Sequence, residues 1–323
     1  MTTLVTGGAG YIGAHIISAL EAAGRETLIV DDLSGDRAVS PVGPVHRIDL
    51  TGADASAALA LLMRERGVTS VVHLAARKSV AESVARPVWY FQQNVGGLTA
   101  LLLAMQQAEV PTLVFSSSAA VYGQAPLEPI AEDADTAPVN PYGDSKLVGE
   151  RLVRWAVEAG RLRAVSLRYF NVAGTASADL VDTGTANLIP LALGAIARGE
   201  RPTVFGDDYP TPDGTCVRDY VHVVDLADAH VAVLDALESG RATSPVYNVG
   251  TGTGSSVREV VERAAAITGM PLEPLYAPRR PGDPPAVVGD VNLIARELGW
   301  RARLGLDDML QSAWDARRTE QPL

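Results

Sequence analysis

Short apolar strands that alternate with helical stretches of about ten or more residues predict an α/β fold for this chain of 323 residues. Two further observations refine the prediction. A glycine-rich turn follows the first strand, and glycine and proline recur in long stretches after about residue 172. Strands that are separated by helices pair in parallel through right-handed crossovers. We therefore expect a doubly wound parallel sheet with a smaller C-terminal α/β domain.

The first predicted strand, Thr3 to Thr6, runs directly into the glycine-rich turn Gly7 to Gly13. An amphipathic helix follows and ends at Gly24. Spaced glycines let a backbone turn tightly and approach a pyrophosphate, while the amino end of the helix favours the anion. The turn therefore predicts a dinucleotide site.

A second predicted strand, Thr27 to Val30, ends in Asp31. A carboxylate at this place binds the ribose hydroxyls of an adenosine and disfavours a 2'-phosphate. We therefore expect NAD rather than NADP.

Four more predicted strands complete the first half of the chain: Val45 to Ile48, Ser70 to Leu74, Leu113 to Phe115 and Val165 to Phe170. The residues that follow predicted strand ends include Asp31, Asp49, Lys78, Ser118 and Asn171. Ligands of a doubly wound sheet lie beyond the carboxyl ends of its strands. We expect these side chains to gather there with the glycine-rich turn.

The stretch N-P-Y-G-D-S-K, Asn140 to Lys146, predicts the start of a helix with Asn140 as cap and Pro141 in the first position. Tyr142 and Lys146 then share one helix face. A tyrosine titrates near ~10, and a neighbouring cation favours its phenolate, so the pair is suited to take a proton from an alcohol. Of 27 basic residues only Lys78 and Lys146 are lysine. An exposed helix start with an incidental tyrosine and lysine is the structural alternative.

Composition changes in the second half of the chain. Two long stretches rich in glycine and proline, Phe205 to Gly214 and Ala277 to Pro285, are too long for simple turns and favour functional loops. Between them we expect a helix, a strand and a helix: Val224 to Leu237, Val246 to Val249 and Ser256 to Thr268. We predict a cofactor domain over residues 1–172, to which residues 219–250 return, and a substrate domain over residues 173–323.

Charge and cysteine content exclude several function classes. A net charge of -11 repels nucleic acid. The single cysteine, Cys216, allows no internal disulfide, and the histidines show no metal-ligand spacing, so we expect no metal. No apolar run approaches the roughly 18 to 20 residues of a membrane span, and Met1 leads straight into a strand. We expect a cytoplasmic protein without membrane contact.

Five motifs identify the chain as a relative of known enzymes. They are T-G-G-A-G-Y-I-G at Thr6 to Gly13, S-S-S-A-A-V-Y-G at Ser116 to Gly123, P-Y-G-x-S-K at Pro141 to Lys146, L-R-Y-F-N at Leu167 to Asn171, and F-G-x-D-Y-P-T-x-D-G-T-x-V-R-D-Y-x-H-V at Phe205 to Val223. The chain resembles the extended short-chain dehydrogenase/reductase superfamily and, within it, the UDP-glucose 4-epimerase family over essentially its whole length. The first three motifs are typical of the superfamily, and the last is specific to the epimerase branch.

The resemblance implies a Rossmann-type cofactor domain and an isomerase of galactose metabolism that inverts C4 of a UDP-hexose through a transient 4-keto sugar. It implies tightly bound NAD that is regenerated in each turnover. It also implies a homodimer through the helices that begin near Asn94 and Tyr142.

The same resemblance assigns roles to individual residues. Ser118, Tyr142 and Lys146 match the catalytic residues, with Tyr142 as the base. The implied cofactor contacts are Gly7, Gly10, Tyr11, Ile12, Gly13, Asp31, Asp49, Leu50, Ala75, Lys78, Asn94, Tyr142, Lys146 and Tyr169. The implied substrate contacts are Lys78, Ser118, Asn171, Asn187, Leu188, Thr203, Phe205, Arg218, Arg280, Asp283 and Val287. Of these, Arg218 and Arg280 match a diphosphate clamp, which suits the guanidinium fork; surface ion pairs are the structural alternative for both.

Departures from the family pattern bear on the substrate. Ala119 and Ala120 follow Ser118, so the acid that a dehydratase needs is missing there. Val287 stands where some epimerases carry a bulky aromatic residue, which permits N-acetylated sugars as well as glucose and galactose. A UDP-glucuronate 4-epimerase would want a cation or hydroxyl near C6; Thr183 and Thr185 are near in sequence, without an added arginine. A non-catalytic NAD-binding sensor or scaffold is the alternative from another class.

Overall fold

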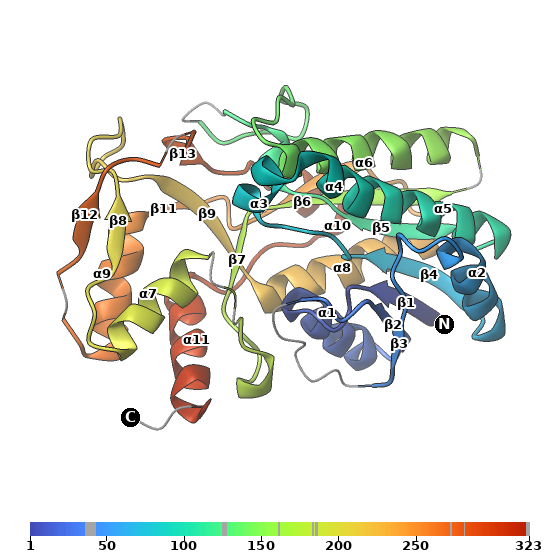
Figure 1. Cartoon of the computed structure of the whole chain (residues 1–323), viewed down its shortest axis with the longest axis horizontal. Helices are drawn as coiled ribbons and strands as arrows, with labels where there is room; N and C mark the ends of the chain where they lie inside the picture. The colour runs from blue at the N-terminus through green and yellow to red at the C-terminus, as the bar shows by residue number, and fades with distance from the viewer. Residues whose placement is uncertain are drawn as a thin grey trace.

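The computed structural model describes residues 1–35, 43–124, 128–160, 162–182, 184, 187–271, 273–280 and 282–320. A large α/β region holds the amino terminus, and a smaller region beside it holds the last helix (Figure 1). None of the helices within these ranges is long and apolar enough to cross a membrane.

The large region is built on a sheet of seven strands in the order β10-β6-β5-β4-β1-β2-β3 among the described residues. Their bounds are β1 Thr2–Thr6, β2 Glu26–Asp31, β3 Val45–Arg47, β4 Val68–His73, β5 Thr112–Ser116, β6 Arg163–Tyr169 and β10 Val246–Val249. Each neighbouring pair runs parallel, so the carboxyl ends share one edge. The predicted doubly wound parallel sheet is confirmed.

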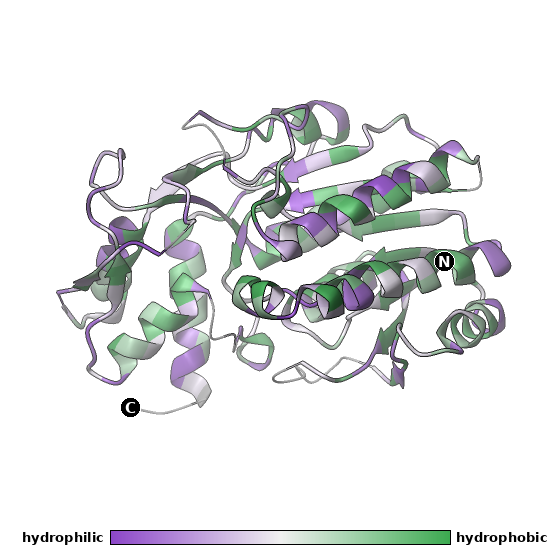
Figure 2. Ribbon diagram, turned by 45° about the horizontal axis from the view of Figure 1, so that its top comes forward, coloured by the Kyte–Doolittle hydropathy of each residue, from purple (hydrophilic) through white to green (hydrophobic). Residues whose placement is uncertain are grey.

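Helices cover both faces of this sheet. One face packs against α1 (Tyr11–Ala22), α8 (Val223–Glu238) and α10 (Asn292–Leu298), which share a hydrophobic core with β6 and β10. The other face packs against α2 (Ala55–Glu65), α5 (Gly97–Gln107) and α6 (Pro141–Glu158) in a second core. Figure 2 shows hydrophobic residues along the strands and on parts of the helices, as burial on both faces requires.

A chain of short helices leads from β4 to α5. It contains α3 (Val80–Ala85), α4 (Pro87–Phe91) and the π-helical turn η1 (Gln92–Gly96). A short 3₁₀ turn, η2 (Ala119–Val121), follows β5. π-helical turns inside α-helices are frequent at functional sites. The turn η1, which contains the buried Asn94, is therefore a candidate part of the expected cofactor site.

The smaller region has a sheet and a strand pair of its own. The sheet contains β7 (Asn171–Ala173), β9 (Val217–His222), β11 (Gly254–Ser256) and β13 (Ala286–Val287), and β8 (Thr203–Phe205) pairs with β12 (Leu275–Ala277). Helices α7 (Leu188–Ala197), α9 (Val257–Thr268) and α11 (Leu306–Glu320) share a third core, and η3 (Ala178–Leu180) is a 3₁₀ turn. Although β9 belongs to this sheet, α8 and β10 after it lie with the large one. The division at residue 172 stays a prediction.

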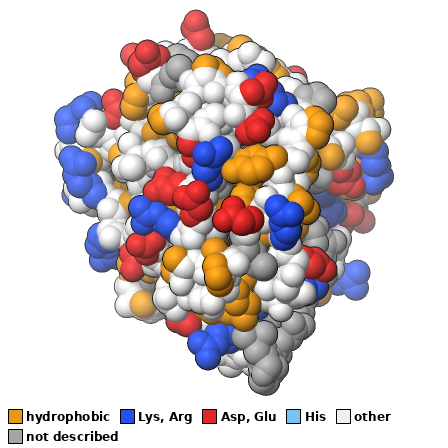
Figure 3. Space-filling model, turned by 90° about the vertical axis from the view of Figure 1, so that its left-hand side faces the viewer, with side chains coloured by type: hydrophobic (Ala, Val, Ile, Leu, Met, Phe, Trp, Pro, Cys, Tyr) orange, Lys and Arg blue, Asp and Glu red, His pale blue; other side chains and the backbone are white. Residues whose placement is uncertain are grey.

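The face that the smaller region presents carries both signs of charge. Acidic and basic side chains are interspersed there, with hydrophobic side chains between them (Figure 3). On this face, therefore, neither sign of charge is gathered into one block.

Candidate functional site

The glycine-rich turn between β1 and α1 forms a cradle for a phosphate. A Cβ added to Gly7, whose φ is +72°, would lie 2.7 Å from the backbone nitrogen of Ala75, so only glycine permits this approach. Helix α1 begins after Gly10 with no side-chain cap and no acidic residue in its first turn. The first N–H groups of an uncapped helix favour an anion. The turn therefore fits the pyrophosphate of a dinucleotide.

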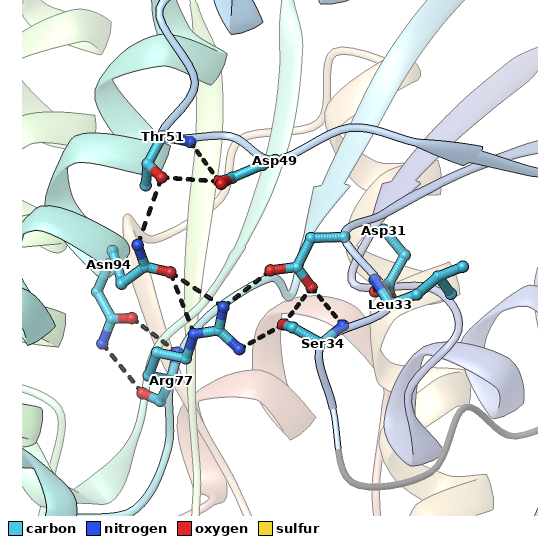
Figure 4. Close-up of polar contacts among 9 residues, drawn as sticks. Asp31, Leu33, Ser34, Asp49, Thr51, Arg77 and Asn94 are labelled. Carbon is cyan, nitrogen blue, oxygen red and sulfur yellow. Dashed lines mark hydrogen bonds and ion pairs between the residues drawn. The ribbon is translucent and has the colours of Figure 1, made fainter.

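Asp31 lies beside this cradle at the end of β2. Its carboxylate accepts hydrogen bonds from the backbone nitrogens of Ala9, at 3.0 Å, and Leu33, at 2.8 Å. The Asp49 carboxylate, at the next strand, accepts from the Thr51 nitrogen at 2.9 Å (Figure 4). The position of Asp31 between the glycine turn and the loop after β2 fits a contact to ribose hydroxyls.

Helix α6 brings the predicted catalytic residues to the same edge. The Asn140 side chain accepts from the Gly143 nitrogen at 2.9 Å, and Pro141 opens the helix, as predicted. A Cβ on Gly143 would lie 2.5 Å from the Ala120 carbonyl oxygen, so the glycine lets α6 start directly against the turn after β5. This contact places Tyr142 beside Ser118, whose hydroxyl acts to lower the pKa of the phenol.

Lys146 lies one turn further along α6 and is only 5% exposed. Its Nζ donates to the Ser116 carbonyl oxygen at 2.8 Å and lies 5.3 Å from the centre of the Phe115 ring. Burial lowers the pKa of Lys146 to about 8, against the pull of the Glu150 carboxylate. The Ser116 carbonyl and the Phe115 ring, which both belong to β5, therefore hold the Lys146 ammonium at the carboxyl end of this strand.

The acidity of Tyr142 differs from the expectation. Burial raises the pKa of the phenol, and the hydrogen bond with Ser118 only partly opposes it. The expected lowering by Lys146 is not found, because burial disfavours the phenolate and raises the Tyr142 pKa. Since the pKa of Lys146 is about 8, its ammonium still stays mostly charged at neutral pH.

A buried ion pair under the site was missed in the sequence. The Arg168 guanidinium binds both carboxylate oxygens of Glu150, at 2.8 and 2.7 Å, with each side chain 7% exposed. The Ser117 hydroxyl donates to the same carboxylate at 2.5 Å. Glu150 thus ties α6 to the end of β5, next to Ser118. Its spacing of four from Lys146 was a visible signal, because it places both on one helix face.

Residues of the two predicted loops meet in the smaller region. Arg218, on β9, donates to the Asp283 carboxylate at 2.8 Å. The Arg280 guanidinium lies 4.0 Å from the centre of the Phe205 ring. Arg218 therefore forms a partly exposed ion pair, as its structural alternative predicts, whereas Arg280 stacks on Phe205. The diphosphate role of both arginines stays a prediction.

The remaining predicted contacts vary in their surroundings. Asn187 lies at the N-cap position of α7 without a capping hydrogen bond from its side chain, which instead donates to Asp182 at 2.8 Å. Val287 packs against a cluster around η2. The edge residues Asn171 and Thr203 are exposed at the starts of β7 and β8, and Lys78 is also exposed. Thr183 and Thr185 lie outside the described residues.

Two cofactor contacts from the resemblance lie close to other site residues. Asn94 is buried in η1, and its side chain bonds both backbone groups of Arg77 and the Ser145 hydroxyl. Tyr169 lies near Tyr142, and burial together with that neighbour raises its pKa. In the described ranges no three His, Cys, Asp or Glu side chains are grouped as metal ligands, and Cys216 is buried.

Comparison with known proteins places these features in a family. The model of the NAD dependent epimerase/dehydratase family matches residues 3–250. The UDP-glucose 4-epimerase of Azospirillum brasilense is 44% identical over 324 aligned residues, which cover 98% of this chain and 92% of the relative.

Solved structures agree with this match. The UDP-glucose 4-epimerase of Stenotrophomonas maltophila, with bound NAD and formylated UDP-arabinopyranose, superimposes with a TM-score of 0.94 at 41% identity and covers 100% of this chain and 99% of that chain. The UDP-Glc/GlcNAc 4-epimerase of Campylobacter jejuni gives a TM-score of 0.84 at 34% identity, over 98% and 99% of the two chains. The chain belongs to the NAD dependent epimerase/dehydratase family.

Proposed function

We propose that this protein is an NAD-dependent isomerase that inverts C4 of a UDP-hexose through a transient 4-keto sugar. The observation that carries the proposal is the meeting of Ser118, Tyr142 and Lys146 at the sheet edge that holds the glycine-rich turn. The similarity to UDP-glucose 4-epimerases over nearly the whole chain supports it.

In this reaction Tyr142 takes the proton from the 4-hydroxyl and later returns it to O4 of the keto sugar. Ser118, which lies beside the phenol, holds the same oxygen. Lys146, fixed by the Ser116 carbonyl, supplies the positive charge below the tyrosine. When bound at the glycine-rich turn, NAD would supply reversible hydride transfer at C4, so that no net redox change results. The protein contributes orientation and electrostatics.

The smaller region binds the nucleotide part of the substrate. Arg218 and Arg280 hold the diphosphate, while Phe205 and Asp283 contact the uridine. The guanidinium fork bonds paired phosphate oxygens, so this end of the substrate stays fixed. The 4-keto sugar can then turn about its link to the diphosphate and present its other face to the same hydride site.

The pocket around Val287 decides which sugars fit. A valine leaves space at C2, so we expect UDP-glucose, UDP-galactose and their N-acetylated forms to equilibrate. Proton NMR of the purified protein with UDP-glucose, UDP-GlcNAc and UDP-glucuronate, without added NAD, tests the proposal. Replacing Val287 with tyrosine is expected to lower kcat/KM for UDP-GlcNAc about tenfold or more and to spare UDP-glucose.

Each outcome of the substrate panel has a meaning. Turnover of UDP-glucuronate alone would favour the uronate epimerase. Turnover of no substrate, with NAD bound, would favour the sensor or scaffold. A tyrosine at residue 287 that leaves the ratio of the two sugars unchanged would show that this residue does not line the C2 pocket.

We also propose a cytoplasmic homodimer. Large apolar side chains lie exposed on the helices around α6, among them Val84, Val88 and Trp155, which are 63%, 83% and 62% exposed. Exposed apolar side chains that gather into one patch are typical of an interface between subunits, and we propose that these three lie in such a patch. Light scattering should give about twice the chain mass of 33.9 kDa, and the exposed Trp155 replaced by glutamate should reduce it to the single mass.

A further inference from the structure

Arg77 has more polar contacts than its neighbour Lys78. Its guanidinium donates to the Asp32 carboxylate at 2.8 Å, to the Ser34 hydroxyl at 2.5 Å, and to the Gln93 side chain at 3.1 and 3.0 Å (Figure 4). It also lies 5.4 Å from the centre of the Trp89 ring. The contacting residues lie in the loop after β2, in η1 and in α4.

The order of the strands shows what this bridge crosses. Arg77 follows β4, whereas Asp32 and Ser34 follow β2, and β1 lies between these strands in the sheet. Strands two places apart are separated by about 10 Å. The Arg77 side chain therefore spans the carboxyl end of β1, where the glycine-rich turn begins and where Ala75 touches Gly7.

Both ends of the bridge are anchored. The Asn94 amide bonds the backbone nitrogen and oxygen of Arg77, at 2.8 and 3.1 Å, and holds it against η1. At the other end, the Asp32 carboxylate receives the charged fork. Although burial alone would raise the pKa of Asp32, hydrogen bonds from Ser34 and the Arg77 cation hold it below its usual value. The carboxylate therefore stays charged at neutral pH.

We propose that Arg77 is a latch over the adenosine half of the cofactor site, which slows the release of NAD. The bridge links the loop that begins at Asp31 to the helix that carries Asn94, and both segments belong to the site described above. The dinucleotide leaves only after the charged fork has parted from Asp32 and Ser34. Because the proposed reaction regenerates NAD in every turnover, slow release keeps the enzyme active. The inference rests on NAD binding, and not on the identity of the sugar.

Arg77→Leu removes the fork and keeps much of the apolar stem. We expect the NAD dissociation rate to rise about tenfold or more, since one factor of ten corresponds to about 1.4 kcal/mol. The rate is measured with the protein that carries NAD, by mixing it with an alcohol dehydrogenase and ethanol, which reduce released NAD to NADH. The purified variant should also contain less bound NAD, while kcat in excess NAD stays near that of the parent.

Arg86→Leu is the matched control. Arg86 also faces the Trp89 ring, at 3.8 Å, but pairs with Glu82 in an exposed i,i+4 bridge away from β2. We expect its NAD release to be unchanged. Asp32→Asn should raise the release rate as Arg77→Leu does, and the double variant should add little to either, because both changes open one contact.

A structural role for Arg77 would give another pattern. In that case Arg77→Leu would lower the unfolding temperature of the NAD-free protein and leave the rate of NAD release unchanged, whereas loss of a latch raises that rate. Release of NAD from Arg77→Leu at the rate of the parent would overturn the proposal. Release that rises equally in the Arg86→Leu control would overturn it as well. These readouts do not depend on epimerase activity.

Discussion

Replacing Tyr142 with phenylalanine should lower the rate of C4 inversion by about a hundredfold to ten-thousandfold, while NAD remains bound. The phenol hydroxyl is the group that lies beside Ser118, and its loss leaves no side chain at that place to take the proton from O4. The ring stays, so packing of α6 against the turn after β5 is kept. Initial rates by proton NMR measure the loss of C4 inversion, and the amount of NAD released by acid measures how much cofactor remains bound.

The exposed Tyr276 provides a control for loss of a phenol hydroxyl. It lies on β12 and is 47% exposed, and Tyr276→Phe should leave the rate unchanged. A Tyr142→Phe protein with the parent's rate would show that another residue is the base. Loss of bound NAD with the rate would indicate that the phenol holds the cofactor instead.

Arg168→Met should reduce the free energy of unfolding by about 3 to 5 kcal/mol, the largest stability change that we expect of a single substitution here. The cost arises because Glu150 would remain buried without its bidentate partner. Urea unfolding of the NAD-free variant measures it. The double variant Arg168→Met, Glu150→Leu should recover much of the loss, since no charge is then left buried.

The exposed pair Arg198–Glu200 is the comparison for the buried one. Arg198→Met there should change the unfolding free energy by less than about 1 kcal/mol, because water solvates both partners. A loss of that small size for Arg168→Met would contradict the role given to the buried pair. Arg168→Met should also slow turnover. The substitution leaves Glu150 without its partner, and Glu150 is the residue that fixes Ser117 beside Ser118.

The sheet and its edge could be predicted because their signals are local. Each strand is a short apolar run, and the first ends in a glycine turn whose spacing has a physical reason at Gly7 and Gly13. The cap at Asn140 and the four-residue spacing of Tyr142 and Lys146 are local as well. These features therefore appeared in the structure where the sequence placed them.

The contacts that were missed depend on strand order and on distant partners. Arg77 follows β4 and Asp32 follows β2, and these strands are brought close only by the sheet order, in which β1 alone lies between them. Asp219 is similar: its buried carboxylate accepts from the nitrogens of Thr251, Gly252 and Gly289, and burial raises its pKa to about 6. No spacing of residues along the chain predicts such hydrogen bonds. The acidity of Tyr142 was also missed, since burial cannot be read from one helix face.

The most direct test of the central claim is epimerisation of UDP-galactose in D₂O, followed by proton NMR, with the protein as purified and no added NAD. Hydride transfer to NAD and back predicts that UDP-glucose forms up to equilibrium and keeps protium at C4, because the hydride never exchanges with solvent. Deuterium at C4 would show inversion by proton exchange, and absence of conversion would show that the site does not carry out this reaction.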